Sequence, residues 1–332
     1  MADTLRRARP ALGTLVDIDI DIGGHAGRGS GAVSALDAAF AAVADVQRLM
    51  SAHDPRSDVR RLSEAAHRGP LRVDPRTVDV LRLARRLHIA SRGLFDVAVG
   101  GAMATAGHLP PLDRAGSAGA GTSTGTSTET SAGTTADIRI VADDTVVFTR
   151  PLHLDLGGIA KGYAIDAAVA ALRSHGVVSG VVNAGGDLRA FGPRTHPVQL
   201  RFDGGVRTVA RLCDGAFAAS CSGAAVHVDP RRGGFAGAGR PARTVAVHAP
   251  TAVLADALTK VALLCPATAD RLCRALGAAW RSFDPGAAAA QDRAGSAVTA
   301  APSPSRASFH VSAGRGAVRS GALSSIWAPA AP

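Results

Sequence analysis

The sequence predicts an α+β protein with mixed or antiparallel sheets and packed helices. Short segments rich in Val, Ile and Leu, typical of strands, are interleaved with longer segments whose apolar residues recur at helical spacing. The chain has 332 residues, 46% of them hydrophobic, so it can bury a substantial core. We expect one domain over residues 1–286, with a low-complexity insert at 114–136, followed by a disordered tail over 287–332.

The N-terminal part contains one predicted strand and two predicted helices. Residues 15–22, LVDIDIDI, alternate apolar and acidic side chains, as a strand with one wet face does. Residues 33–50 place apolar side chains at helical spacing, which predicts an amphipathic helix. A second helix should begin after Asp74, a good N-cap residue, have Pro75 in its first turn, and end near Gly93.

Residues 114–136 have almost no apolar bulk and no periodicity, which predicts a flexible insert. Three strands are expected after it, within residues 138–156: IRIV, TVVF and LHLDL. A helix should then run from about Ile159 to a glycine cap at Gly176. Further strands are predicted at GVVSGVVNAGG, VQLRFDG, TVARLC, AFAASC and TVAVHA, and a last helix at residues 252–264.

Composition argues against several classes of protein. The net charge of +10 could indicate nucleic-acid binding, but the arginines are scattered and aromatic residues make up only 4% of the chain. We therefore expect no nucleic-acid partner; affinity for a phosphorylated small molecule also accounts for positive charge. No run of 18 apolar residues offers a membrane span, and the N-terminus lacks a signal-peptide pattern, which favours a cytoplasmic location.

The four cysteines are too far apart for a Cys-x-x-Cys zinc site: Cys213, Cys221, Cys265 and Cys273. Cys265 is expected on a buried helix, as an inert apolar residue.

Rare residue types gather at one glycine turn, LDLGGIAKGYAID (residues 154–166). It holds the only tyrosine, Tyr163, and Lys161, one of only two lysines. A turn from a strand through Gly157 and Gly158 into a helix can bind phosphate, because helix N-termini present free N–H groups. The spacing matches neither the dinucleotide-binding nor the P-loop fingerprint, so a merely structural connection remains an alternative.

Acidic residues in apolar surroundings are a second signal. Asp155 ends an apolar segment and Asp256 lies within VLADALT, where a carboxylate is costly unless it is paired, hydrogen-bonded or metal-bound. Each could instead cap its helix. Asp96 lies beside Phe95 in GLFDVAVGG, and His227 begins HVDPRRGG, where Asp-Pro is most simply a turn.

Together these segments resemble the ApbE family of FAD:protein FMN transferases, over roughly residues 10–275 without the insert. The matching blocks are PALGTLVDI, LMSAHDPRSDVRRLSEA, GLFDVAVGG, LDLGGIAKGYAID, VVNAGGDLRAFG, HVDPRRGG and LADALTK. The resemblance implies an ApbE-like, T-fold-like α+β fold. It also implies a Mg²⁺-dependent reaction in which FMN passes from FAD to a Ser or Thr of an acceptor protein, releasing AMP.

Site residues follow from the same resemblance, motif by motif. Asp155 and Lys161 would contact FAD, while the Gly158 carbonyl and the Asp256 carboxylate would hold the metal. His227 would contact the flavin phosphates or assist proton transfer, and with Lys161 and Asp256 completes the expected catalytic set. The flavin pocket would be lined by Leu94, Phe95 and Asp96, with His53 and Leu12 nearby. The acceptor would carry a Ser/Thr-Gly-Ala-Thr-like motif.

The chain departs from the family pattern at several positions. Leu12 replaces the usual Met, His53 stands where many relatives have an aromatic residue, and HVDPRRGG is a shortened block. Lys260 stands where many relatives have a Thr metal ligand, four residues after Asp256. Since positions i and i+4 share a helix face, its ammonium should face the phosphates or pair with Asp256.

Two other functions remain open from the sequence. With water as the nucleophile, the same site would be an FAD pyrophosphatase giving FMN and AMP. A site that keeps the pocket without chemistry would belong to a flavin-binding or carrier protein. Many relatives are exported, whereas this sequence predicts a cytoplasmic protein.

Overall fold

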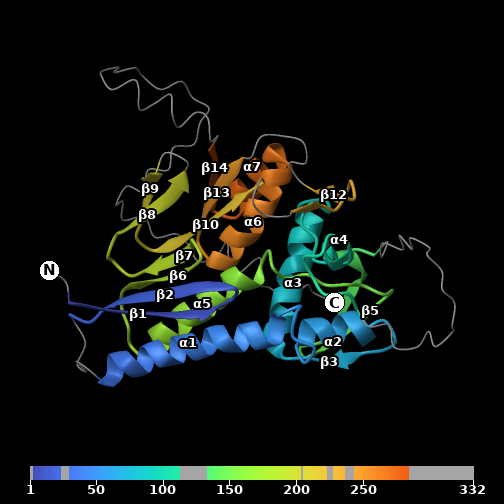
Figure 1. The fold of residues 1–332 in the computed structure, drawn as a ribbon, viewed down its shortest axis with the longest axis horizontal. Coiled ribbons are helices and arrows are strands. Elements are labelled where there is room, and N and C mark those ends of the chain that lie inside the picture. The colour runs from blue at the N-terminus through green and yellow to red at the C-terminus, as the bar shows by residue number, and fades with distance from the viewer. Residues whose placement is uncertain are drawn as a thin grey trace, which may run out of the picture.

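The computed structural model describes residues 3–23, 30–112, 133–202, 205–222, 227–235 and 243–283. Its centre is a seven-stranded sheet in the order β1-β2-β6-β7-β10-β13-β14, in which every neighbouring pair is antiparallel (Figure 1). The strands are β1 (Thr4–Ala11), β2 (Thr14–Asp21), β6 (Gly180–Ala184), β7 (Asp187–Phe191), β10 (Gly215–Cys221), β13 (Thr244–Ala249) and β14 (Ala279–Phe283). The antiparallel α+β class predicted from the sequence is confirmed.

Both faces of this sheet are covered over β7, β10 and β13, whose side chains contribute to a core on each side. On β10, Ala216 and Ala218 belong to the main core, which lies against α5 (Ala160–Ser174) and α6 (Ala252–Leu264). Phe217, pointing the opposite way, belongs to a second core with residues of the hairpin β8–β9. That hairpin consists of β8 (His196–Phe202) and β9 (Gly205–Leu212).

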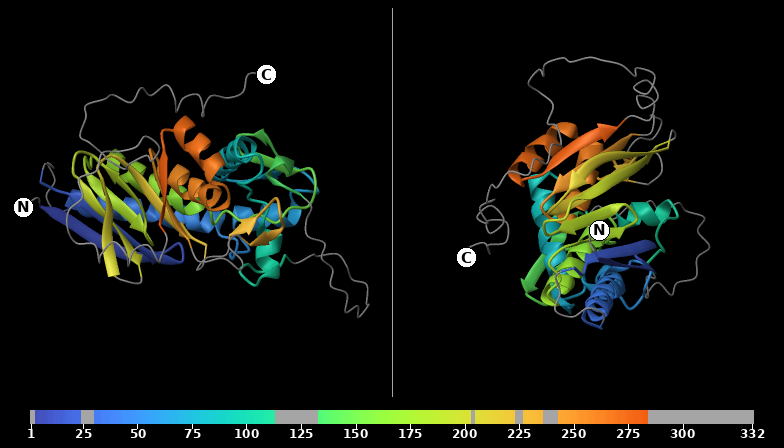
Figure 2. Two further views of the ribbon diagram at one scale, coloured as in Figure 1. Left: turned by 90° about the horizontal axis from the view of Figure 1, so that it is seen from above. Right: turned by 90° about the vertical axis from the view of Figure 1, so that its left-hand side faces the viewer.

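Helix α1 (Ser30–Met50) lies over α5 and reaches the second part of the molecule (Figure 1). That part contains α2 (Asp58–Ala65), α3 (Pro75–Ala90), α4 (Gly100–Thr105), the short 3₁₀ helix η1 (Thr135–Asp137) and the sheet β3-β5-β4. Its strands are β3 (Leu71–Arg72), β5 (Thr145–Phe148) and β4 (Ile138–Ala142). Seen from above, this part lies at the opposite end of the molecule from β8 and β9 (Figure 2).

The remaining elements are α7 (Pro266–Ala275), which packs on α6 and β14, and the pair β11 (Val228–Asp229) and β12 (Gly234–Phe235). Asp74 caps α3 as predicted, by accepting a hydrogen bond from the Arg76 N–H. Gly93 and Gly176 both have positive φ, +80° and +79°, just after helices, as expected of C-terminal caps. Within the described residues, no helix is both long and apolar enough to cross a membrane.

The segment LHLDL is not a strand, contrary to the sequence prediction. Its backbone bonds go to irregular partners: Gly100 N–H donates to the His153 carbonyl, Asp155 N–H to the Val97 carbonyl, and Leu154 N–H to the Ser63 hydroxyl. A segment of alternating apolar residues forms a strand only when a neighbouring strand can pair with it. Here the backbone partners come from the start of α4, the loop before it and α2. The segment therefore leads into the glycine turn as buried, irregular chain.

Two further expectations need correction. The predicted flexible insert is ordered at its end, because Thr135 is fully buried and its hydroxyl donates to Asp96 at 2.7 Å. Cys265 lies at the junction of α6 and α7, half-buried, and not within a helix. The rest of the insert, residues 114–132, and the predicted disordered tail, residues 287–332, lie outside the described residues.

Candidate functional site

A cavity of about 400 Å³ lies where the glycine turn, α6, β10 and the loop after α3 meet. Apolar side chains form one part of its wall and charged or polar ones the other. The lining residues are Leu94, Phe95, Asp96, Val97, Val99, Met103, Leu109, Asp155, Gly157, Gly158, Lys161, Ala219, Ser220, Cys221, His227, Val228, Pro230, Lys260 and Leu264. The structure thus brings together most of the site residues predicted from segments far apart in the sequence.

The glycine turn is shaped by Asp155. Its Oδ1 accepts the Gly157 N–H at 2.8 Å, a local Asx turn that directs the chain into α5. Burial raises the pKa of Asp155 above its ordinary value. Gly158 lies directly against the lysine of α6, since a Cβ at Gly158 would be 3.2 Å from Lys260 Cε. The glycine turn therefore packs closely against the side chain of Lys260.

Lys161, in the first turn of α5, forms an ion pair with Asp187, with Nζ and Oδ2 2.8 Å apart. Asp187 is buried at the start of β7 and also accepts the Ala219 N–H at 3.2 Å. Burial opposes the charge on Lys161, but the nearby Asp187 and Asp256 outweigh it and hold the lysine pKa above its usual value. We did not predict Asp187 from the sequence, although it lies within the matching block VVNAGGDLRAFG.

Asp256 is fully buried in the middle of α6, so it does not cap its own helix. Its Oδ2 instead accepts the Gly162 N–H, in the first turn of α5, at 3.1 Å. Its Oδ1 binds the Lys260 ammonium at 2.6 Å, which is one of the two arrangements expected from the i,i+4 spacing. The same ammonium lies 3.1 Å from the Thr259 hydroxyl and 3.3 Å from the Ser220 hydroxyl.

His227 contributes a neutral imidazole to the cavity wall. Burial and the positive charge of Lys260 lower its pKa to about 4, against an opposing effect of Asp256. Its Nε2 is buried and has no hydrogen-bond partner among the described residues. A buried polar atom without a partner in a cavity wall is a suitable contact for a polar ligand.

The other predicted site residues fall into two groups. Leu94 and Phe95 are buried in the apolar part of the wall. Asp96 lines the cavity too, but its carboxylate also holds the loop in place, accepting bonds from the Thr135 hydroxyl and from the Ala98 N–H, both at 2.7 Å.

His53 and Leu12 do not line the cavity. His53 is exposed, outside the cavity wall. Leu12 lies in the turn between β1 and β2 with φ +56°, and its N–H donates to Gln47 Oε1 at 2.6 Å.

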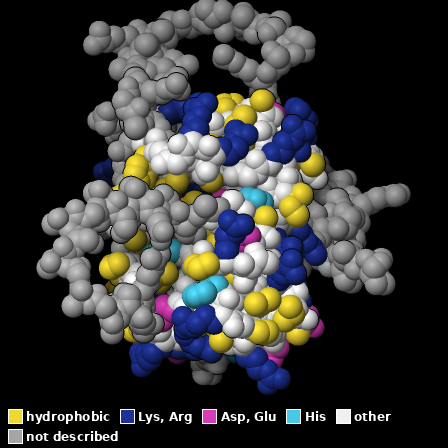
Figure 3. Space-filling model, turned by 90° about the vertical axis from the view of Figure 1, so that its right-hand side faces the viewer, with side chains coloured by type: hydrophobic (Ala, Val, Ile, Leu, Met, Phe, Trp, Pro, Cys, Tyr) yellow, Lys and Arg dark blue, Asp and Glu magenta, His cyan; other side chains and the backbone are white. Residues whose placement is uncertain are grey.

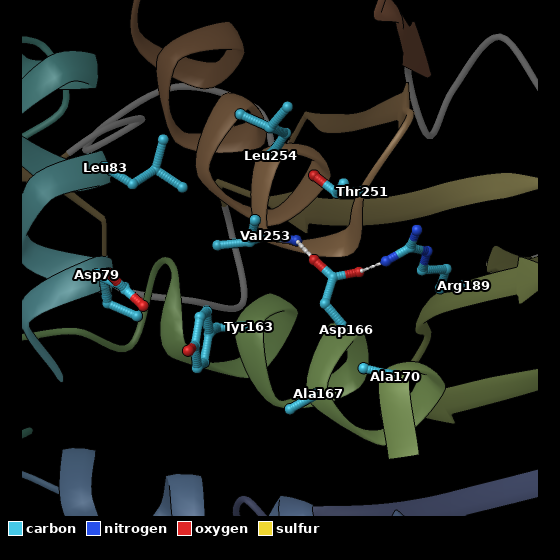
Figure 4. Close-up of a pocket in the computed structure, with 11 residues that line it drawn as sticks. Asp79, Leu83, Tyr163, Asp166, Ala167, Ala170, Arg189, Thr251, Val253 and Leu254 are labelled. Carbon is cyan, nitrogen blue, oxygen red and sulfur yellow. Dashed lines mark hydrogen bonds and ion pairs between the residues drawn. The ribbon is translucent and has the colours of Figure 1, made fainter. Parts of the chain in front are cut away.

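A second cavity, of about 270 Å³, lies between α3, α5 and α6 (Figure 4). Tyr163 lines it, and burial raises the pKa of this phenol to about 12. Asp166 accepts the N–H groups of Ala252 and Val253 at 3.0 and 2.9 Å and pairs with Arg189 at 2.6 Å. The two rare residues of the glycine-turn segment thus lie in different cavities: Lys161 in the first and Tyr163 in the second.

The group around Lys260 suits a hard cation. It consists of a carboxylate and two hydroxyls, and oxygen donors of this kind are those that Mg²⁺ prefers. The ammonium of Lys260 already stands among them as a tethered cation. In the part of the chain that the structure describes, no three His, Cys, Asp or Glu side chains gather as a metal site. A divalent ion here would therefore need further oxygen ligands, such as those of a phosphate.

Basic residues form no continuous patch on the face shown in Figure 3. Lys and Arg side chains are spread over it, with hydrophobic, acidic and His side chains between them. The basic side chains visible on that face are thus dispersed, as the arginines are along the sequence.

Comparison with known proteins gives consistent matches. A family model described as the ApbE family matches residues 12–279. A curated FAD:protein FMN transferase from Rhodobacter capsulatus is 33% identical over 120 residues, which are 36% of this chain and 23% of the relative. One from Klebsiella pneumoniae is 26% identical over 167 residues, or 49% of this chain and 51% of the relative. The chain thus spans about half or less of the length of these curated relatives.

Solved structures match over more of the chain. The flavin transferase ApbE of Vibrio cholerae has a TM-score of 0.69 at 19% identity, covering 86% of this chain and 97% of that one. The ApbE protein of Thermotoga maritima has a TM-score of 0.70 at 22% identity, covering 86% and 95%. These likenesses show a shared fold. With the family model matching most of its length, the chain belongs to the ApbE family.

Proposed function

We propose that this protein transfers FMN from FAD to a Ser or Thr hydroxyl of an acceptor protein and releases AMP. The observation that carries the proposal is the composition of the first cavity. Its wall joins the apolar Leu94 and Phe95 to a glycine turn flanked by the chain's two lysines. An aromatic ring attached to a pyrophosphate has the same division into an apolar and an anionic part. The names of the curated relatives support this activity.

In the proposed reaction the acceptor hydroxyl oxygen attacks the phosphorus on the FMN side of the pyrophosphate. The new phosphoester bond forms, the bond from this phosphorus to the bridging oxygen breaks, and AMP leaves with that oxygen and the electron pair. The hydroxyl proton passes to a base. Such phosphoryl transfer depends mainly on positioning and on neutralising phosphate charge. Lys161 and Lys260 are placed to supply that charge; in the protein without ligand they pair with Asp187 and Asp256.

His227 is the proposed acceptor of the hydroxyl proton. Its imidazole is neutral, with a pKa of about 4, and its Nε2 has no partner among the described residues. A bound pyrophosphate would raise this pKa toward neutrality, because a nearby negative charge favours the imidazolium. Binding of the substrate would thus make His227 a better base when it is needed.

Mg²⁺ is part of this proposal as a partner of the phosphates. When bound, it would neutralise charge on the phosphate oxygens. Asp256 and the Gly158 carbonyl are the protein groups that would hold it, with Ser220 and Thr259 supplying hydroxyl oxygens nearby. The acceptor motif, Ser/Thr-Gly-Ala-Thr-like, and the cytoplasmic location stay predictions.

One assay distinguishes the three candidate functions. The protein is incubated with FAD, Mg²⁺ and an acceptor protein carrying the motif, and the products are separated. Flavin fluorescence that remains on the denatured acceptor, with one AMP released per flavin attached, is the expected result. Replacing the motif Ser or Thr by Ala in the acceptor should abolish the labelling.

The other outcomes would refute transfer. Free FMN and AMP in equal amounts, without labelled acceptor, would show an FAD pyrophosphatase. FAD that binds but stays intact in the presence of several candidate acceptors would show a flavin-binding protein.

A further inference from the structure

Lys260 occupies a cation site made of oxygen atoms. Its ammonium lies 2.6 Å from Asp256 Oδ1, 3.1 Å from Thr259 Oγ1 and 3.3 Å from Ser220 Oγ. The two hydroxyls are 2.8 Å apart and hydrogen-bonded to each other. An ammonium with three donors matches three surrounding acceptors, so the group is fully satisfied without an ion.

The position of the ammonium is fixed by the fold. Lys260 follows Asp256 by four residues on α6, so the two side chains share one helix face. The lysine stem rests against Gly158, and only 20% of the side chain is exposed. Asp256 is fully buried, and a buried carboxylate needs a cation beside it. In the free protein Lys260 provides that cation, from the same helix.

A divalent ion cannot bind Asp256 Oδ1 while the ammonium is there. A protonated lysine is not a ligand, and two cations a few ångströms apart in a partly buried cavity repel each other strongly. The ion therefore requires the ammonium to move to another anion. The phosphate oxygens of a bound nucleotide are such acceptors, and Lys260 reaches the cavity in which we place FAD.

We propose that Lys260 makes metal binding at Asp256 conditional on a phosphate ligand. In the free protein the ammonium fills the site and excludes divalent ions. When a pyrophosphate binds, the Lys260 ammonium moves to form hydrogen bonds with the phosphate oxygens. The Asp256 carboxylate is then free to bind the ion. The first half of this inference concerns the free protein alone; the second rests on FAD as the ligand, as proposed above.

Direct metal binding tests the inference without relying on catalysis. Mn²⁺, a spectroscopic substitute for Mg²⁺, is titrated into the protein with and without FAD, and bound ion is measured by electron paramagnetic resonance. The native protein should bind Mn²⁺ detectably only when FAD is present. Lys260→Met, which keeps an unbranched stem but removes the charge, should bind Mn²⁺ without FAD roughly tenfold or more tightly than the native protein does. Adding Asp256→Asn to this variant should abolish that binding.

Thermal unfolding gives an independent readout and a matched control. Lys260→Met should lower the melting temperature, because it leaves Asp256 buried without a cation, and Mg²⁺ should restore it. Lys161→Met removes the same charge from the neighbouring pair with Asp187 but leaves Lys260 in place. That variant should also be less stable, and Mg²⁺ should not restore it.

Equal Mn²⁺ affinity of the native protein and Lys260→Met in the absence of FAD would overturn the inference. So would a native protein that binds FAD but gains no Mn²⁺ affinity from it. If FAD does not bind at all, the proposed function fails, while the titrations without FAD still decide whether Lys260 excludes the ion.

Discussion

At the residue scale, each of the chain's two lysines is paired with one buried carboxylate: Lys161 with Asp187, and Lys260 with Asp256. All other residues in the Lys and Arg total are arginines. An ammonium is a compact charge on a flexible stem, whereas a guanidinium is a planar fork, so the two are not interchangeable in a narrow cavity. This selective use of lysine, at the two positions nearest the glycine turn, is the clearest residue-level sign of a ligand site in this molecule.

Buried neutral histidines should make the protein sensitive to acid. Burial, together with the nearby charge of Arg60, lowers the pKa of His153 to about 4 in the folded state. In the unfolded chain a histidine titrates near 6.5. The folded state disfavours the protonated imidazole of His153. The contribution of the neutral imidazole to the unfolding free energy is therefore complete above pH 6.5 and is lost as the pH falls from 6.5 toward 4.

The change His153→Gln should therefore flatten the dependence of the unfolding free energy on pH between 6.5 and 4. We expect the difference in unfolding free energy between the native protein and His153→Gln to change by roughly 1–3 kcal/mol between pH 6.5 and pH 4. Chemical denaturation at a series of pH values measures it. His108→Gln, at an exposed position, is the control and should leave the pH profile of the native protein unaltered. Parallel profiles for native protein and His153→Gln would contradict the assignment.

At the scale of elements, α5 and α6 cap each other. Asp256 of α6 accepts an N–H from the first turn of α5. Asp166 of α5 accepts the N–H groups of Ala252 and Val253 at the start of α6, and Figure 4 shows the bond from Val253. Free N–H groups at helix N-termini need such acceptors. The two helices approach closely at Gly162, where a Cβ would lie 2.3 Å from the Ala252 carbonyl oxygen. These reciprocal caps fix α5 against α6, so that Lys161 and Lys260 both line the first cavity.

This contact predicts unequal effects of two glycine substitutions in helices. Gly162→Ala should lower the unfolding free energy by roughly 2–4 kcal/mol, because the obstructing atom is backbone and cannot move alone. Gly101→Ala, in α4, meets nothing within 4 Å and should change stability by no more than about 1 kcal/mol, in the stabilising direction. Urea unfolding of both variants measures the difference. Equal unfolding free energies of Gly162→Ala and Gly101→Ala would show that α5 and α6 can move apart without loss of stability.

At the scale of the whole molecule, the seven-stranded sheet with its helices is joined to a smaller part by α1 and by the chain before α5. The first cavity lies where these parts meet. The loop after α3, α4, β10 and α6 contribute to its wall. One link across the low-complexity insert is specific: the buried Thr135 hydroxyl donates to Asp96 and accepts the Val97 N–H at 2.8 Å. The end of the insert therefore holds two residues of the cavity wall, Asp96 and Val97, in place.

Two shortened chains test where the insert ends. Replacing residues 114–132 by a short Gly/Ser linker, with the chain ended after residue 287, should leave the melting temperature and FAD binding close to those of the full chain. Extending the replacement through residue 136 should destabilise the protein by roughly 2–4 kcal/mol, because Asp96 and Val97 lose their partner in a buried place. Thermal unfolding and flavin fluorescence quenching are the measurements. Insoluble protein from the shorter replacement would contradict the proposed limits of the insert.

The sequence by itself determined the elements that carry local signals. The cap residue Asp74, the glycine stops at Gly93 and Gly176, and the apolar spacing of α3, α5 and α6 all act within a few residues of chain. That Asp256 and Lys260 share one helix face followed from the i,i+4 spacing for the same reason, with their pairing as one of two expected outcomes. Family motifs then indicated the charged residues that line the first cavity, Asp96, Asp155, Lys161 and Lys260, together with Leu94, Phe95, Gly158 and His227.

Only the tertiary structure decided features that depend on a distant partner. The sequence of β1, TLRRARPA, lacks a strand pattern, and pairing with β2 alone makes it a strand. LHLDL has the pattern, but its backbone groups bond to a loop and to Ser63. The partner of Lys161, Asp187, stands on another strand, and Thr135 reaches Asp96 from the end of the insert. Hydrogen bonds and ion pairs of this kind join residues far apart in the chain, so no local spacing encodes them.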